Sequence, residues 1–588
     1  MVPAWMLTAN AGPGFVRVAC GPPCTLTRLA RSGRSVTPHA AIVTSASSPA
    51  ISVLTCPGRG DGAFMDRRSV LRGGLATTGG AAIALLSGGS VSAGAAPRAG
   101  TRAAPALLRG GRPRLTHGVQ SGDVTAREGV VWARSDRPAR MLVEVSRRPD
   151  FRQARTVRGP VLTPETDLTG KALLRGLPDG EELHYRVRLA DLDRAGLTSE
   201  PVTGRFRTAP HHRRRDVRFV WSGDLAGQGW GINPDLGGFR IFRAMGAVDP
   251  DFFLCSGDLV YADGPLAETV PLPDGRTWRN IVTPEKSAVA QTLPEYRGQF
   301  RYNLLDANLR AFNARVPMIY QWDDHETVNN WYPGEILDLP QYTEKRVDVL
   351  AARARRAAFE YTPMRSSRTG RIHRRISYGP LLDVFVLDMR TYKSPNDANT
   401  SPTQENALLG AEQSAWLRRE LRRSTATWKV MAADLPIGLI VPDGSAAQEG
   451  VAQGDDGAPL GREREIADLL SYARRHRVRN MVWLTADVHY TAAHFYDPSK
   501  AGFSDFDPFW EFVSGPLNAG AFGPNKLEGT FGPQLRFAQA PPRANTSPAD
   551  GYQFFGNVEI DAHTETLTVH LRDLDGKAVY SQTLTPRR

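Results

Sequence analysis

The 588-residue sequence predicts an α/β layered domain preceded by a small antiparallel β-sandwich. From 115 to 208, short apolar segments alternate with turn residues and show no helical period, as in a β-sandwich. From 217 onward, apolar strand-like runs alternate with helical patterns, which is typical of an α/β domain. With 41% hydrophobic residues, the chain is long enough to fill two or three cores.

We predict that residues 1–95 form a leader and signal peptide and that 96–114 form a linker. Arg67 and Arg68 precede a mild apolar stretch and an A-x-A motif (Ala93, Ala95), the layout of a twin-arginine secretory signal. The stretch is too short and too rich in Gly and Thr for a stable membrane anchor. We therefore expect export to the periplasm, cell wall or medium, with the twin-arginine translocation machinery as a partner.

Met65 stands directly before the arginine pair, so we expect translation to start there; a disordered extension is the alternative. The eight Arg and two acids of residues 1–95 account for half of the +12 net charge, leaving +6. This excess is scattered and lacks a basic aromatic-rich motif, so we expect a surface that attracts anionic substrates and no dedicated nucleic-acid partner. Three cysteines (Cys20, Cys24, Cys56) fall in the leader, and Cys255 is predicted to be a buried thiol.

The sandwich is predicted over 115–209 and the α/β domain over 215–588. The expected strands of the α/β domain are 217–223, 251–257, 316–322, 381–388, 428–434 and 480–487, and the expected helices are 347–361, 412–424 and 462–476. The residues after 554 alternate with period two around a DLDG turn, which predicts a closing antiparallel hairpin. Two long loops, 264–286 and 442–461, are expected to select the substrate.

Several of the expected strands end on a carboxylate, and a second metal-ligand residue follows soon after it. The pairs are Asp258 with Tyr261, Asp324 with His325, and Asp487 with His489. Ligands bind beyond the carboxyl ends of the strands in α/β sheets, so we expect these side chains to meet at one edge. Taken singly, an Asp after a strand is often a helix N-cap, and we interpret Asp388 and Asp434 in this way.

Together these residues predict a centre that holds cations. We expect Asp258 to bridge two ions and Asp224 to hold the first ion with Tyr261 and His489. Asp324 and Asp487 would hold the second ion, with an amide oxygen from Asn329 or Asn330. A phenolate favours ferric iron and an oxygen-rich position favours calcium, other divalent metals being alternatives. The predicted catalytic residues are His325, as a general acid or phosphate ligand, together with Glu326 and Arg390.

The chain resembles the PhoD-like alkaline phosphatase/phosphodiesterase family of metallophosphoesterases, from His117 to about Pro541. The segments that carry the resemblance are HGVQSGDVTAREGVVWAR, GDLVY, WDDHETVNN, LDMRTY, LGAEQSAWL and TADVHY. It implies a four-layer αββα core, iron with calcium, a periplasmic or secreted location, and Asp258, Tyr261, Asp487 and His489 as ligands. Typical members carry a Ser-Cys pair after the first strand, where this chain has Ser222-Gly223. This departure bears on the ligands of the iron and on which metal is bound.

We therefore expect an exported metal-dependent phosphatase or phosphodiesterase. It would hydrolyse small phosphate esters with a metal-activated water at a two- or three-metal centre. One alternative is a surface-binding protein that retains the fold without turnover. Another is a phosphodiesterase specific for phospholipids or teichoic acids.

Overall fold

The computed structural model describes residues 111–365, 370–403 and 406–588. The predicted leader, the signal peptide and Cys20, Cys24 and Cys56 lie outside the described residues. Among the residues that are described, no helix combines the length and the apolar character needed to cross a membrane.

Two antiparallel sheets pack face to face at the amino end of the described chain. One has the strand order β4-β3-β6-β7, and the other contains β1, β2 and β5. The bounds are β1 Leu115–Gly122, β2 Glu128–Ser135, β3 Ala139–Ser146, β4 Arg155–Leu162, β5 Thr169–Arg175, β6 Glu182–Ala190 and β7 Val202–Arg207. Inward residues of both sheets form one core, with Val131 and Leu174 on one side and Val143 and Tyr185 on the other. This is the β-sandwich expected from the sequence.

One sheet of the sandwich continues into the α/β domain. Strand β1 pairs in parallel with β12 through Gly122 and Met318, which joins a nine-stranded sheet of order β24-β23-β22-β8-β9-β12-β1-β2-β5. Its further strands are β8 Val217–Ser222, β9 Phe252–Ser256, β12 Met318–Gln321, β22 Phe554–Ile560, β23 Leu567–Asp573 and β24 Ala578–Leu584. The two regions that the sequence separates therefore share a sheet.

A second sheet has seven strands in the order β13-β14-β15-β18-β20-β19-β21. Its strands are β13 Arg374–Ser377, β14 Leu382–Val386, β15 Trp428–Ala432, β18 Met481–Thr485, β19 Thr491–Tyr496, β20 Phe509–Val513 and β21 Pro533–Gln539. Strands β14, β15, β18 and β20 run parallel to one another, and every residue of β14 and β15 is buried. Strands that are buried along their whole length are typical of a sheet covered on both faces.

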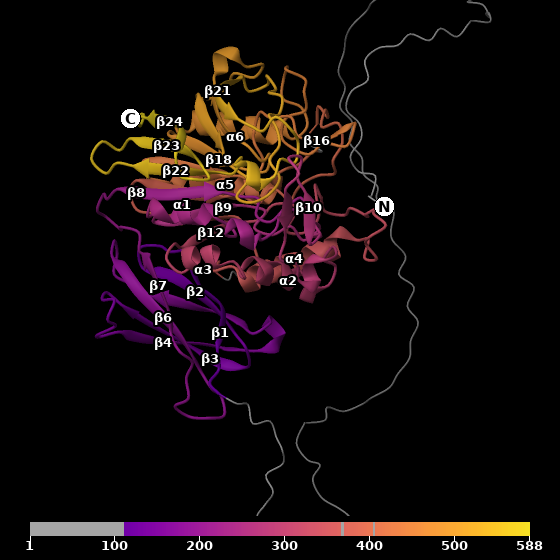
Figure 1. Ribbon diagram of the computed structural model, residues 1–588. Helices are drawn as coiled ribbons and strands as arrows, with labels where there is room; N and C mark the ends of the chain where they lie inside the picture. Colours follow the sequence, from indigo (N-terminus) through magenta and orange to yellow (C-terminus); the bar gives the residue numbers. More distant parts are fainter. Residues whose placement is uncertain (1–110, 366–369, 404–405) are drawn as a thin grey trace, which may run out of the picture. The chain divides into compact units, whose positions relative to one another are not determined.

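The two sheets pack against each other, and helices cover their outer faces (Figure 1). Phe219 and Leu254 of the larger sheet share a core with Val384 and Val430 of the smaller one. Helices α1 Ile241–Ala247, α2 Leu293–Asn303, α3 Ala307–Asn313 and α4 Val347–Tyr361 contribute to the core on the other face of the larger sheet. Helices α5 Gly410–Arg423 and α6 Glu463–Arg475 pack on the other face of the smaller sheet. The result is the four-layer αββα core that the resemblance implied.

The two predicted loops each contain a short hairpin. Strands β10 (Thr269–Pro271) and β11 (Thr277–Arg279) pair in the first loop, and β16 (Pro442–Asp443) and β17 (Ala447–Gln448) pair in the second. The remaining short elements are 3₁₀ turns: η1 Pro164–Thr166, η2 Pro234–Leu236, η3 Pro284–Lys286, η4 Pro498–Lys500 and η5 Pro548–Asp550. Both loops are thus more ordered than the sequence suggested.

Candidate metal centre

The candidate ligands lie just beyond the carboxyl ends of strands from both sheets. Asp224, Asp258 and Asp324 follow β8, β9 and β12 of the larger sheet, whereas Asp487 and His489 follow β18 of the smaller one. The sequence predicted a single sheet edge. The structure instead draws the candidate ligands from two sheets, because these sheets pack face to face and their adjacent strand ends lie close together.

Among the residues that the structure describes, three groups of side chains are close enough to hold a metal ion, with ligand atoms within 4.8 Å of one another in each group. The groups are Asp224, Asp258 and His489; Asp258, Asp324 and His325; and Asp323, Asp324 and Asp487. Asp258 belongs to the first two groups, which is the arrangement expected of a bridging carboxylate. Asp323 is a member that the sequence reasoning did not select.

The backbone turns sharply where these side chains leave the strands. Asp224, Asp258, Asp487 and His489 have φ values of 68°, 48°, 64° and 60°. Left-handed conformations are uncommon for residues other than glycine, and they concentrate at functional sites. The turns at Asp224 and Asp258 are tied together, because the Leu225 N–H donates to the Asp258 carbonyl at 2.8 Å. These two strained turns therefore support each other.

His489 presents its Nε2 to the first group. Its Nδ1 lies 2.5 Å from the Gly520 carbonyl oxygen, so Nδ1 carries the proton and Nε2 has the lone pair. Nε2 lies 2.8 Å from the Tyr261 hydroxyl and 3.5 Å from Asp224 Oδ1. Burial lowers the pKa of His489 to about 4, which keeps the ring neutral. A neutral imidazole, a phenol and a carboxylate thus converge at one point.

The carboxylates of this centre fit bound cations. Both side-chain oxygens of Asp224, Asp323 Oδ2 and Asp324 Oδ1 are buried without a hydrogen-bond donor. Burial raises the pKa of Asp224, Asp258 and Asp487 well above the ordinary range, and neighbouring carboxylates raise it further. Buried acceptors with no donor are costly, and cations would satisfy both their lone pairs and their charge.

The resemblance described above implies a cysteine at position 223, where this chain has a glycine. A Cβ at this residue would lie 2.9 Å from the Gly257 carbonyl oxygen and 3.3 Å from the Ala486 Cβ, so the backbone leaves little room for a thiol. Asp224 directs its carboxylate into the centre instead. A Cβ at Gly515 would collide with Asp224 Oδ2, so a residue without a side chain is needed there as well.

His325 forms a half-buried pair with Asp263, a residue that the sequence reasoning missed. Its Nδ1 lies 2.8 Å from Asp263 Oδ1, and its ring stacks on Tyr261 with centroids 4.2 Å apart. Burial lowers the pKa of His325, but Asp263, Asp324 and Asp258 outweigh this effect and raise it well above its usual value. The His325 side chain keeps 14% of its surface exposed, and the Asp263 side chain keeps 10%. The only sequence signal for Asp263 was its place five residues after Asp258.

Glu326 lies beneath the centre. Its carboxylate accepts hydrogen bonds from the main-chain N–H groups of Asp258 at 3.2 Å, Leu259 at 2.9 Å and Asp323 at 2.9 Å. These bonds fix the two turns that carry Asp258 and Asp323. Glu326 therefore positions these two turns, and the catalytic role expected from the sequence stays a prediction.

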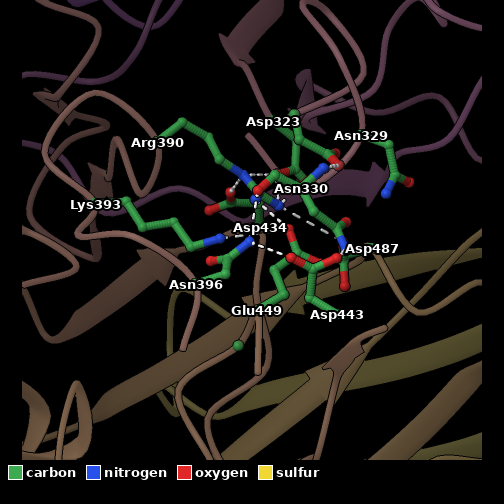
Figure 2. A network of polar contacts seen from close by, with 12 residues as sticks. Asp323, Asn329, Asn330, Arg390, Lys393, Asn396, Asp434, Asp443, Glu449 and Asp487 are labelled. Carbon is green, nitrogen blue, oxygen red and sulfur yellow. Dashed lines mark hydrogen bonds and ion pairs between the residues drawn. The ribbon is translucent and has the colours of Figure 1, made fainter. Parts of the chain in front are cut away.

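Asn329 and Asn330 differ in their surroundings. The Asn330 side chain donates to Asp443 Oδ1 at 3.0 Å, and its main-chain N–H donates to Asp324 Oδ2 at 2.5 Å. Figure 2 shows Asn330 within the polar network, whereas Asn329 stands to one side. Asn329 is exposed, and its main-chain N–H donates to Asp263 Oδ2 at 2.8 Å. Asn330 thus links the second long loop to a predicted metal ligand.

The remaining predicted residue, Arg390, is completely buried among carboxylates. One of these belongs to Asp434, which the sequence led us to interpret as a helix cap. No helix begins at Asp434, and its Oδ2 lies 3.5 Å from Arg390 Nε. No helix begins at Asp388 either; its Oδ1 accepts the Thr391 N–H at 2.9 Å, so Asp388 caps a turn and not the expected helix. Glu449, from the second long loop, also pairs with Arg390 and was missed.

The four-layer core and the buried carboxylate–histidine cluster between its sheets define a protein of the metallophosphoesterase class. The model of the PhoD-like phosphatase family matches residues 219–571, and that of the PhoD-like phosphatase N-terminal domain matches 101–210. The chain belongs to the PhoD-like phosphatase family.

Individual relatives agree with this assignment. The chain is 31% identical over 309 residues to alkaline phosphatase D of Bacillus subtilis (strain 168), and the match spans 50% of each protein. Among solved structures, one of PhoD aligns with a TM-score of 0.62 and 22% identity, covering 82% of this chain and 90% of its own. The purple acid phosphatase PPD1 from yellow lupin seeds aligns with a TM-score of 0.51 and 14% identity, covering 81% and 74%. These two alignments show that the chain shares the fold of the aligned proteins.

Proposed function

We propose that this chain is an exported metal-dependent phosphoesterase that hydrolyses small phosphate monoesters or diesters. The observation that carries the proposal is the set of buried carboxylates with unpartnered oxygens, which converge on a neutral His489 and on Tyr261. Bound there, the ions would polarise the phosphoryl group and lower the pKa of a water molecule toward neutrality. The names of the family and of the Bacillus relative support the same reaction.

The roles of the protein side chains follow from their positions. Asp224, Asp258, Tyr261 and His489 would hold the first ion, and Asp258, Asp324 and Asp487 the second. Asp263 fixes the His325 ring through Nδ1, which leaves Nε2 free to hold or donate a proton at the edge of the site. Glu326 keeps the Asp258 turn in place.

We assign ferric iron to the first position and calcium to the second. Tyr261 supports iron, because a phenolate is a ligand that ferric iron favours, and the oxygen-rich second position suits a hard divalent cation. The iron-loaded protein should therefore show a visible charge-transfer band. Tyr261→Phe should abolish the band and keep the fold. The absorption spectrum would check the band, and far-UV circular dichroism would check the fold. A coloured Tyr261→Phe protein would show that Tyr261 is not the ligand.

The proposed export rests on the twin-arginine signal in the sequence. A precursor carrying Arg67→Lys and Arg68→Lys should accumulate inside the cell, because the pair is the recognition feature of that route. Fractionation of cells that express either the wild-type precursor or the double variant would show where each protein accumulates. Normal secretion of the double variant would contradict the twin-arginine route.

The proposed reaction is tested by assaying the purified protein on p-nitrophenyl phosphate and bis-p-nitrophenyl phosphate, with metal analysis of the same sample. We expect hydrolysis of at least one ester by protein that contains bound metal. Metal-loaded protein that hydrolyses neither ester would favour the alternative of a binding protein without turnover.

A further inference from the structure

The third group of potential ligands already has a cation beside it. Arg390 Nη2 lies 2.5 Å from Asp323 Oδ1, 3.7 Å from Asp324 Oδ1 and 3.8 Å from Asp487 Oδ1. These three residues are the members of that group. A single guanidinium nitrogen therefore faces all of its carboxylates, where an ion would otherwise bind.

The guanidinium is held from several sides. Nε donates to Asp323 Oδ1 at 2.5 Å and lies 3.5 Å from Asp434 Oδ2, while Nη1 pairs with Glu449. The Arg390 side chain has no exposed surface, and Figure 2 shows it directed into the acidic cluster. An arginine is effectively always protonated, so this position carries a permanent positive charge.

The first group has no such cation, whereas the second group contains His325 and shares Asp324 with the third group. None of the described ion pairs joins a lysine or an arginine to Asp224 or Asp258, and Asp224 has two unpartnered oxygens. The carboxylate of Asp224 is therefore the one with both oxygens unpartnered and no lysine or arginine paired with it among the described residues.

We propose that Arg390 is a resident cation that fills the third position, so that the centre binds two metal ions and not three. This inference rests on the proposed metal centre and specifies its composition. Arg390 then acts as a positioning residue: it neutralises Asp323 and orients Asp324 and Asp487 toward the ions without contacting the substrate. The pairing of Arg390 with Glu449 also fastens the second long loop to the centre.

The test is the number of ions bound per chain, measured by elemental analysis after metal-free protein is loaded with iron and then dialysed against calcium. Wild type should bind two ions. Arg390→Gln removes the charge and should open the third position, so that an additional, weaker calcium binds. Arg390→Lys keeps the charge and should bind the wild-type number.

If Arg390→Gln does not fold, Asp323→Asn provides the second measurement. Asp323 faces Arg390, so this variant should retain both ions with unchanged calcium affinity in titration calorimetry. Loss of an ion from Asp323→Asn, or three ions in wild type, would overturn the inference while leaving a metal-dependent phosphoesterase intact. A wild-type protein that binds no ions would overturn both the inference and the proposed function.

Discussion

Asp258→Asn should abolish phosphoesterase activity and metal binding together. Asp258 belongs to two of the three potential ligand groups, and an amide in its place is neutral and cannot bridge two cations. We expect turnover to fall by at least roughly 10³-fold, since a metal's contribution is several kcal/mol and about 1.4 kcal/mol corresponds to a factor of ten. The measurements are the rate on a p-nitrophenyl ester and the metal content of the same preparation.

Asp388→Asn is the matched control, because Asp388 also follows a buried strand but belongs to none of the ligand groups in the described chain. It should retain its ions and most of its activity, with at most a modest loss of stability from the weakened turn. Near-full turnover and normal metal content in Asp258→Asn would exclude the two-ion arrangement.

His325→Ala should lower turnover by roughly 10²–10⁴-fold, the usual contribution of a general acid or base. We expect metal content to stay near the wild-type value, because the other candidate ligands remain. Steady-state kinetics and elemental analysis of the purified variant would measure both. Loss of an ion would instead identify His325 as a ligand, a role that its place beside Asp258 and Asp324 also permits.

Asp263→Asn distinguishes the orientation of the His325 ring from its protonation. The substitution keeps an oxygen near His325 Nδ1 and removes the charge that helps to hold the ring protonated. We expect a smaller loss of turnover than in His325→Ala, together with a shift of the pH–rate profile. A profile identical to that of wild type would show that the Asp263–His325 pair does not contribute to catalysis.

Much of the fold could be predicted from the sequence. The buried strands are continuous apolar runs, so all six strands expected in the α/β domain exist, and the helix predicted over 347–361 has the bounds of α4. Helices α1 and α3 have only seven residues each, too few to show a period. Helix α2 was missed although Thr292 and Glu295 form a capping box that marks its start.

The candidate site was predictable where a ligand follows a strand directly. Asp258, Asp324 and Asp487 are candidates of this kind, and the structure brings Asp324 within reach of both Asp258 and Asp487. Glu449 lies in a loop and reaches the centre only through tertiary contacts, so no local pattern marks it. Likewise, the sequence does not show that Arg390 is enclosed by carboxylates from four other segments.

The most direct test of a metal-dependent phosphoesterase is activity before and after removal of the ions. Purified protein would be assayed on bis-p-nitrophenyl phosphate as isolated, after chelation and dialysis, and after iron and calcium are restored. We expect activity to disappear on chelation and to return with the two metals, because the carboxylates of the centre require cations. Full activity in the metal-free protein would contradict the proposed function.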